Sequence, residues 1–187
     1  MDIEVGINTK MKFTVLDDLP LTSKILLCIL CGIGCCWGFV NNAVLLVFAS
    51  KVGFPMAVVI CAIRNNARNL VHLILYVAVL IAVGWIYFYQ VPVVLVPELT
   101  KNFVPTATDF VIAIGLGMAL NHFWDHVTRI NIIVMIAGMA SLLPACVMAG
   151  YWASSAQWNN MTDGLLLWGE YAVGIFIGST MIEKIYE

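Results

Sequence analysis

Two polar clusters interrupt a strongly apolar sequence and carry residue types that could bind a ligand. The first contains Arg64, Arg68 and His72, which stand four residues apart and would share one stripe of a helix. Guanidinium groups on such a stripe can bind an anion or pair with a carboxylate across a helical bundle. They can also reach the membrane surface and contact lipid headgroups, and this is the role that we expect for the two arginines.

The second cluster follows a later apolar run and contains His122, Asp125, His126 and Arg129. Their spacing puts the four side chains on one helical face. Two histidines four residues apart can bind a metal ion or take part in a proton relay within a membrane. The other possibilities are a contact with a pore or a partner helix, or an amphipathic turn at the membrane surface. Because His72 is the one further ligand in evidence, we predict no metal site and expect the surface turn.

An acidic residue, Glu170, lies within the last apolar run, on the same helical stripe as Gly174 and Gly178. Glycines four residues apart let another helix approach closely, and Gly34 and Gly38 form a similar pair in the first apolar run. Unless it lies near the headgroups, a carboxylate on a glycine face must meet another helix, because lipid does not tolerate its charge. We therefore expect Glu170 to be protonated, paired with an arginine or exposed to a pore. The glycine pairs are expected to lock helices or subunits together.

The residues Cys28 and Cys31 have the C-x-x-C spacing of a dithiol redox centre. A membrane thiol oxidase also needs a second cysteine pair in a loop, which Cys61 and Cys146 cannot supply. All six cysteines of the chain lie inside apolar runs, where free cysteine behaves as a small hydrophobic residue. We therefore predict no structural disulfides and no bound cofactor.

The composition indicates the class of protein. Of the 187 residues, 62% are hydrophobic and 11% are charged, whereas soluble domains average about 45–50% and about 25%. These values predict a multi-pass membrane protein of one compact domain in contact with the lipid bilayer. The net charge of −2 gives no reason to expect a nucleic-acid partner. The polar tail at 1–24 is too long and too acidic for a cleaved signal peptide, so the first apolar run is expected to remain as an anchor.

The uncharged apolar runs predict where the chain crosses the membrane. The expected spans are residues 25–47, 70–89, 130–151 and 165–183, while residues 110–128 either cross, re-enter or lie at the interface. The predicted fold is an all-α integral membrane protein, a bundle of four to five transmembrane helices over residues 25–187. One or two short interfacial or re-entrant helical segments complete this bundle.

Two further signals mark the ends of the expected helices. Trp85, Tyr87 and Tyr89 close the second span with an aromatic belt of the kind found at membrane interfaces. Prolines in the connector that follows exclude a continuous helix, and Thr108 with Asp109 can cap the next one.

The expected function is non-catalytic, because the soluble segments are too small for a catalytic domain and the glycine pairs favour close helix contact. We expect a small subunit of a larger membrane assembly, such as a secretion, translocation or channel complex, packed against other subunits or copies of itself. The expected location is the bacterial inner membrane. A stand-alone transporter or ion channel, with segments 52–72 and 110–129 forming the pathway, is the first alternative. A thiol redox enzyme that uses Cys28 and Cys31 is the second.

Overall fold

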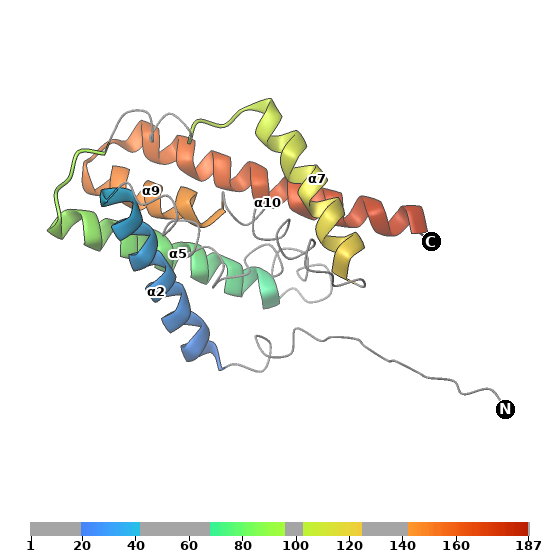
Figure 1. Ribbon diagram of the computed structural model, residues 1–187, viewed down its shortest axis with the longest axis horizontal. Helices are drawn as coiled ribbons and strands as arrows, with labels where there is room; N and C mark the ends of the chain where they lie inside the picture. Colours follow the sequence, from blue (N-terminus) through green and yellow to red (C-terminus); the bar gives the residue numbers. More distant parts are fainter. Residues whose placement is uncertain (1–19, 42–67, 96–102, 125–141, 187) are drawn as a thin grey trace.

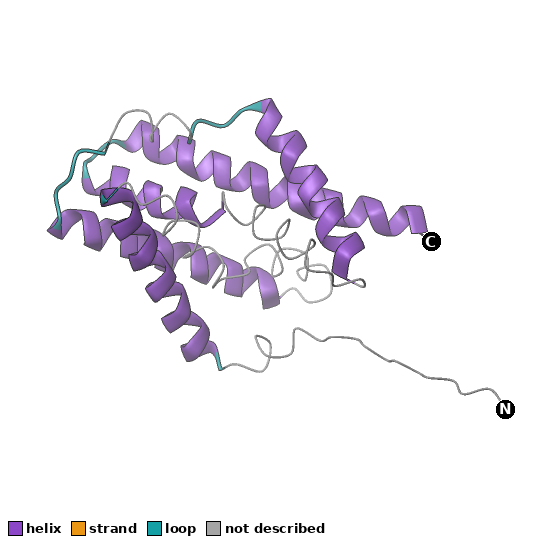
Figure 2. Cartoon of the chain, in the orientation of Figure 1, coloured by secondary structure: helices purple, strands orange, loops and turns teal. Residues whose placement is uncertain are grey.

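The structure is a computed structural model that describes residues 20–41, 68–95, 103–124 and 142–186. These residues form five helices and no strand (Figures 1 and 2). The helices are α2 (Leu21–Val40), α5 (Arg68–Gln90), α7 (Ala107–Trp124), α9 (Leu142–Ser154) and α10 (Trp158–Tyr186). The predicted all-α class is therefore confirmed for the described part of the chain.

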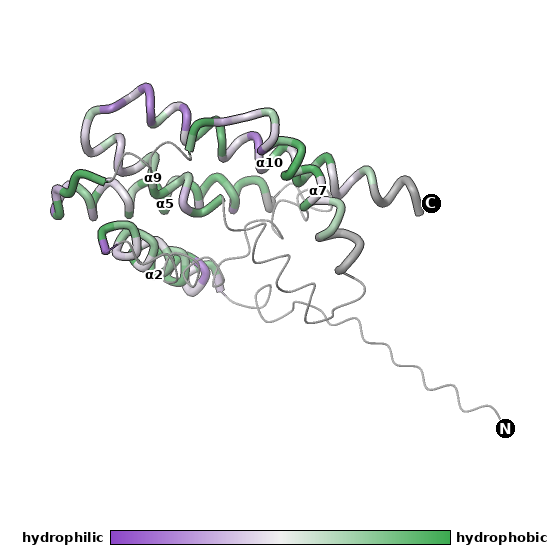
Figure 3. Tube along the Cα trace, turned by 45° about the horizontal axis from the view of Figure 1, so that its top comes forward, coloured by the Kyte–Doolittle hydropathy of each residue, from purple (hydrophilic) through white to green (hydrophobic). Residues whose placement is uncertain are grey.

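Three of these helices are long and apolar enough to cross a membrane. The qualifying stretches are Leu21–Val40, Leu70–Gln90 and Trp158–Met181. The shortest of the three, at 20 residues, is about 30 Å long, which matches the hydrocarbon core of a bilayer. The three stretches overlap the first, second and last expected spans, and Figure 3 shows that α5 is hydrophobic along most of its length. The apolar parts of α7 and α9 are shorter.

The start of α2 differs from the sequence prediction, while the predicted end of this span at residue 47 lies outside the described residues. The polar tail was expected to reach residue 24, but the helix already begins at Leu21, directly after an extended Pro20. A proline fits this position because the first N–H groups of a helix have no partner within it. At the other end, the side chain of Asn41 donates a hydrogen bond to the carbonyl of Trp37 (2.8 Å). Asn41 is exposed and closes the helix.

The central element is α9, in which every residue from Leu142 to Trp152 is buried. A helix that is apolar on all sides belongs inside a bundle, and α2, α5 and α10 contact it (Figure 1). Helices α5 and α9 run in the same direction, because Gly84 lies beside Val147 and Phe88 beside Tyr151. Helix α2 follows the same direction along α5, as Cys28 lies beside Tyr76 and Gly32 beside Leu80 and Val83.

Backbone-to-backbone contact joins α5 to α9. A Cβ atom added at Gly84 would collide with the carbonyl of Val147. A Cβ added at Gly150 would come within 2.6 Å of the backbone nitrogen of Trp85. Neither glycine belongs to a pair that the sequence singled out, yet both are required for the two helices to approach this closely.

The second backbone contact joins α7 to α10, which also run in the same direction. A Cβ added at Gly117 would collide with the carbonyl of Ile175, and one at Gly178 with the carbonyl of Ile114. A Cβ added at Gly174 would lie 2.5 Å from that of Ala113. The glycine pair predicted at 174 and 178 therefore faces a helix of the same chain.

The glycine pair of α2 lies differently. Gly38 is buried and Gly34 is half-buried. The glycine of α2 that a side chain of α5 approaches closely is Gly32, where a Cβ would lie 3.0 Å from a methyl carbon of Val83.

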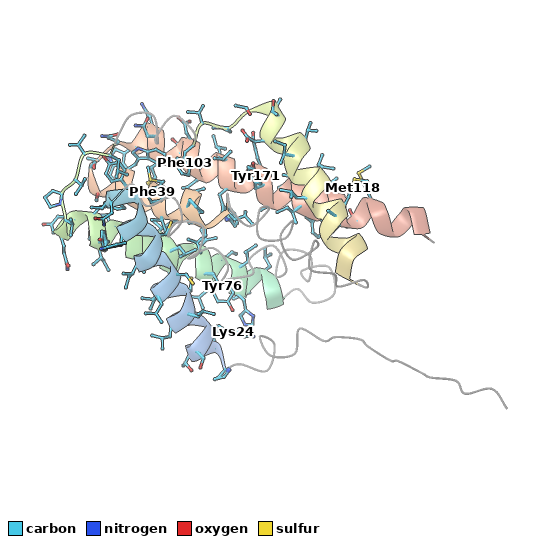
Figure 4. All side chains as sticks on the ribbon, viewed as in Figure 1. Lys24, Phe39, Tyr76, Phe103, Met118 and Tyr171 are labelled. Atoms are coloured by element: carbon cyan, nitrogen blue, oxygen red, sulfur yellow. The ribbon has the colours of Figure 1, made fainter. Side chains whose placement is uncertain are left out.

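A cluster of aromatic rings gathers where α2, α5 and α9 end. Phe39 of α2 contacts Phe103 (6.1 Å between centroids), and Phe103 contacts Trp152 of α9 (6.0 Å). Phe88 of α5 packs edge to face against Tyr151 (5.0 Å). Edge-to-face contacts between rings stabilise a fold beyond the effect of burying their apolar surface. Figure 4 shows Phe39 and Phe103 at this end of the bundle, with Lys24 at the far end of α2. The aromatic cluster is defined here as Phe39, Phe88, Phe103, Tyr151 and Trp152.

A tight turn reverses the chain between α9 and α10. The N–H of Gln157 donates to the carbonyl of Trp152 (2.8 Å), which closes the end of α9. Ala156 adopts a left-handed backbone conformation, with φ of 56°. Glycine is the residue usually found at such a helix end, because its lack of a Cβ removes the steric cost of positive φ.

The first prediction compares two glycines of α7. We expect Gly117→Ala to lower the free energy of unfolding by about 1–3 kcal/mol, because the new methyl group would meet the backbone of α10. Gly115→Ala, two residues earlier, meets nothing within 4 Å and should raise stability by up to about 1 kcal/mol through helix propensity. Unfolding in mixed detergent, followed by circular dichroism, measures both. Equal effects of the two substitutions would contradict the contact between α7 and α10.

The second prediction concerns the turn. Ala156→Gly should raise the free energy of unfolding by about 1 kcal/mol, because it removes the strain of a left-handed alanine. The matched control is Ala153→Gly, within α9, which should lower stability by about 1 kcal/mol. A loss of stability in both variants, measured by the same unfolding assay, would show that residue 156 is not left-handed.

Candidate functional site

The start of α7 is a capping box that involves two residues. The hydroxyl oxygen of Thr106 accepts a hydrogen bond from the N–H of Asp109 (3.3 Å), and Oδ2 of Asp109 accepts one from the N–H of Thr106 (3.1 Å). The Thr106 hydroxyl also donates to Oδ2. These bonds satisfy backbone donors that a helix start leaves without partners. The sequence predicted a cap at residues 108 and 109, whereas Thr106 caps the helix and Asp109 stands in its first turn.

Tyr171 fixes this helix start against α10. Its hydroxyl donates to Oδ1 of Asp109 (3.3 Å), and its side chain is buried. Tyr171 lies 13 residues after Trp158, or about 20 Å along the helix. The first turns of α10 after Trp158 are polar, and the apolar run expected from the sequence begins at residue 165. Tyr171 lies about 9 Å along that run, so α7 begins inside it and not at its end.

The connector that leads to this point enters the bundle. Residues 91–95 and 103–106 of it are described. Leu95 is buried, and its N–H donates to the hydroxyl of Tyr151 on α9 (3.3 Å). Phe103 then packs on Trp152 as part of the aromatic cluster. The side chains of Leu95 and Phe103 and the backbone N–H of Leu95 thus pack against the helices of the bundle.

Glu170 precedes Tyr171 in sequence and lies one helical turn before Gly174, which faces α7. Its side chain is half-buried, and among the described residues its buried Oε2 atom has no hydrogen-bond partner. The same holds for Nε1 of Trp168. A buried polar atom without a partner is costly, so Oε2 of Glu170 needs a hydrogen-bond partner or an ion from beyond the described residues, such as water, another part of the chain or a second chain.

The expected polar clusters are described only in part. Arg64, Asp125, His126 and Arg129 lie outside the described residues. Arg68 begins α5 and His122 belongs to the last turn of α7, but the structure does not describe their side chains. His72 is half-buried near the start of α5, with its ring 6.4 Å from that of Tyr76.

The cysteines are packing residues in the described part of the chain. The five described cysteines are free and buried: Cys28, Cys31, Cys35, Cys36 and Cys146. The sulfur of Cys28 faces the backbone carbonyl of Tyr76 on α5 (3.8 Å). Cys28 and Cys31, the pair that a redox function would use, therefore lie on the buried face of α2.

The sequence contained one signal of this site that the cap prediction missed. The pattern Thr106-x-x-Asp109 is a capping box, and it places the helix start two residues earlier than a cap at Thr108 does. The contact between Asp109 and Tyr171 joins residues 62 positions apart, and no spacing rule along one helix predicts it.

Comparisons with known proteins give one result. A family model described as "Domain of unknown function (DUF389)" matches residues 46–177, well over half of the chain. The match includes α5, α7 and α9 and continues along α10 past Glu170 and Tyr171, while α2 lies outside it. No curated protein and no solved structure gives a match.

The third prediction tests the link between α7 and α10. A double-mutant cycle with Asp109→Asn and Tyr171→Phe should give a coupling free energy of about 1 kcal/mol, because each change weakens the same hydrogen bond. Tyr89→Phe, at an exposed tyrosine of α5, serves as the control and should show no coupling to Asp109→Asn. Unfolding of the purified variants in detergent supplies the four free energies of each cycle. Additive effects of Asp109→Asn and Tyr171→Phe would contradict the bond.

Proposed function

The chain belongs to the DUF389 family, a domain of unknown function, and we propose that it is a multi-pass membrane protein that conducts a proton or a small cation. The observation that carries this proposal is the start of α7 beside Tyr171, inside the apolar run of α10. The proposed bundle has four to five membrane segments, and α7 is a half-helix that begins at membrane depth. The bacterial inner membrane is the proposed location.

Irregular backbone inside a bilayer supports a transport function. Non-helical segments are tolerated at this depth where protein buries them or where they line a water-filled cavity. Thr106, Ala107 and Thr108 are exposed on the described chain. Inside a bilayer, the polar start of α7 would be covered by water, by residues outside the described part of the chain or by another protein chain. Interrupted helices of this kind form the substrate and ion sites of many transporters.

The chemistry at the start of α7 favours a cation over an anion. A free helix N-terminus binds anions through its backbone N–H groups. Here the carboxylate of Asp109 already occupies that position, and Glu170 adds a second carboxyl group one residue from Tyr171. Carboxylates at membrane depth bind protons or hard cations and mark ion pathways. Glu170 is the residue that we assign to the transported ion or proton.

The buried thiols support a non-catalytic function. Cys28 and Cys31 are enclosed between α2 and its neighbours. A dithiol that exchanges electrons needs access to its oxidant or to a substrate thiol. Membership of an assembly is the second candidate function, since a partner helix can supply the group that Glu170 and Trp168 lack within the described residues. The Gly174 face contacts α7, so such a partner would dock elsewhere.

The fourth prediction tests transport. We expect purified protein in liposomes loaded with a pH-sensitive dye to dissipate an imposed proton or potassium gradient. Glu170→Gln should lower this flux about tenfold or more, because it removes the titratable group at the helix crossing. Asp163→Asn is the matched control: it lies on the same helix, about 10 Å nearer to Trp158, and should leave the flux close to that of the wild type.

Two results would overturn the transport proposal. One is the absence of flux in the wild-type protein, and the other is an equal flux in wild type and Glu170→Gln. Mass measurement in mild detergent then tests the second candidate. A further protein present in fixed stoichiometry supports a subunit of an assembly, and the chain alone or with copies of itself contradicts it.

A further inference from the structure

The exposed side chains of α2 change character along the helix. Leu26 and Leu30 are exposed and apolar, and Trp37 follows them with half of its surface exposed. The exposed Asn41 then ends the helix. The order toward this end is therefore apolar, aromatic and polar.

The same order holds on α5. Val71 and Ile74 are exposed near the start of the helix. Trp85 and Tyr89 are exposed near its end, where their rings stack with centroids 5.9 Å apart. The exposed Gln90 is the last residue of the helix.

Helix α10 also has an exposed tryptophan at this end. The exposed Gln157 precedes the helix, and Trp158, its first residue, is 63% exposed. Exposed polar residues follow in the next turn (Asn159, Asn160 and Thr162), and the exposed residues two and four turns from Trp158 are the apolar Leu166 and Val173. The three helices with an exposed tryptophan at this end are the three that are long and apolar enough to cross a membrane.

All these exposed aromatic residues lie at one end of the bundle. Phe39, two residues after Trp37, belongs to the aromatic cluster, and so do Phe88 of α5 and Trp152 at the end of α9. Helix α9 contacts both α2 and α10, so the exposed aromatic residues surround a common core. The girdle is defined here as Trp37, Trp85, Tyr89 and Trp158.

We propose that this girdle binds the headgroup region of a phospholipid bilayer and fixes the depth of the bundle in it. The proposal rests on the membrane location proposed above. Tryptophan and tyrosine favour this region, because their rings are apolar while the indole N–H and the hydroxyl need a polar partner. A protein partner would have to cover helices on separate sides of α9, whereas a bilayer surrounds them all.

The position of the girdle determines how deep in the membrane α7 begins. Tyr171 lies about 20 Å along α10 from Trp158, and half the thickness of the hydrocarbon core is about 15 Å. A tilt of about 20° shortens this distance to about 19 Å along the membrane normal, and the headgroup region extends about 5 Å beyond the hydrocarbon core on each side. Tyr171 and the bonded Asp109 therefore lie close to the midplane of the bilayer. The α9–α10 turn, with its exposed Ser155 and Gln157, lies in water beyond the girdle.

Fluorine NMR of the full chain in liposomes tests the proposal. The tryptophans carry a 5-fluoro label, and the four signals used are assigned through Trp37→Phe, Trp85→Phe, Trp152→Phe and Trp158→Phe. Lipids with a nitroxide on the headgroup are compared with lipids with a nitroxide deep in the acyl chain. The three girdle signals should be broadened at least about twofold more by the headgroup label. The buried Trp152 is the control and should be broadened less by that label than the girdle signals.

Each result decides one question. Stronger broadening of the girdle signals by the acyl-chain label would overturn the girdle while leaving the membrane location in place. No broadening of these signals by either label would overturn the girdle and the membrane location together. Preferential broadening of Trp158 alone would also overturn the proposal, because three helices must reach the same surface.

Discussion

Close contact between helix backbones is the constraint on which the rest of the structure depends. Apolar side chains gain little from helix association inside lipid, so van der Waals packing must hold a membrane bundle together. Two pairs of helices achieve this packing through glycine, α5 with α9 at Gly84 and Gly150, and α7 with α10 at Gly117 and Gly178. Because these contacts involve backbone atoms, a side chain at any of the four positions would move a whole helix. The glycines thus determine which residues of one helix lie next to which residues of its partner.

The contact between α7 and α10 has a consequence for function. It places the start of α7 opposite the middle of α10, and in the proposed membrane location the backbone N–H groups there need partners that lipid cannot supply. Asp109 and Thr106 supply those partners for each other, and Tyr171 joins the same group. Glu170, the residue before Tyr171, lies next to this group. Its buried Oε2 atom has no hydrogen-bond partner among the described residues. The packing geometry and the proposed ion site are therefore two results of one helix crossing.

The sequence predicts some of these features and not others, for physical reasons. The ends of the span predicted at 70–89 agree to within one residue with those of the apolar stretch Leu70–Gln90. A long uncharged run has few alternatives to a helix. The pair Gly174 and Gly178 has the four-residue spacing that marks a packing face, but spacing does not show which helix will contact it. Neither Gly84 nor Gly150 has another glycine four residues away, so only the three-dimensional contact reveals them. The depth at which α7 begins depends on a bond between distant residues and has no local signal.

Solid-state NMR of the isotope-labelled protein in lipid bilayers tests the crossing of α7 and α10 most directly. The structure predicts a carbon–carbon cross-peak between Cα of Gly174 and Cβ of Ala113, two positions that are in contact only if the helices touch. A cross-peak between Gly84 and Val147 serves as the internal reference for the other glycine contact. Both signals together are the expected result. A clear signal for Gly84 with none for Gly174 would contradict the proposed helix arrangement and, with it, the position of the ion site.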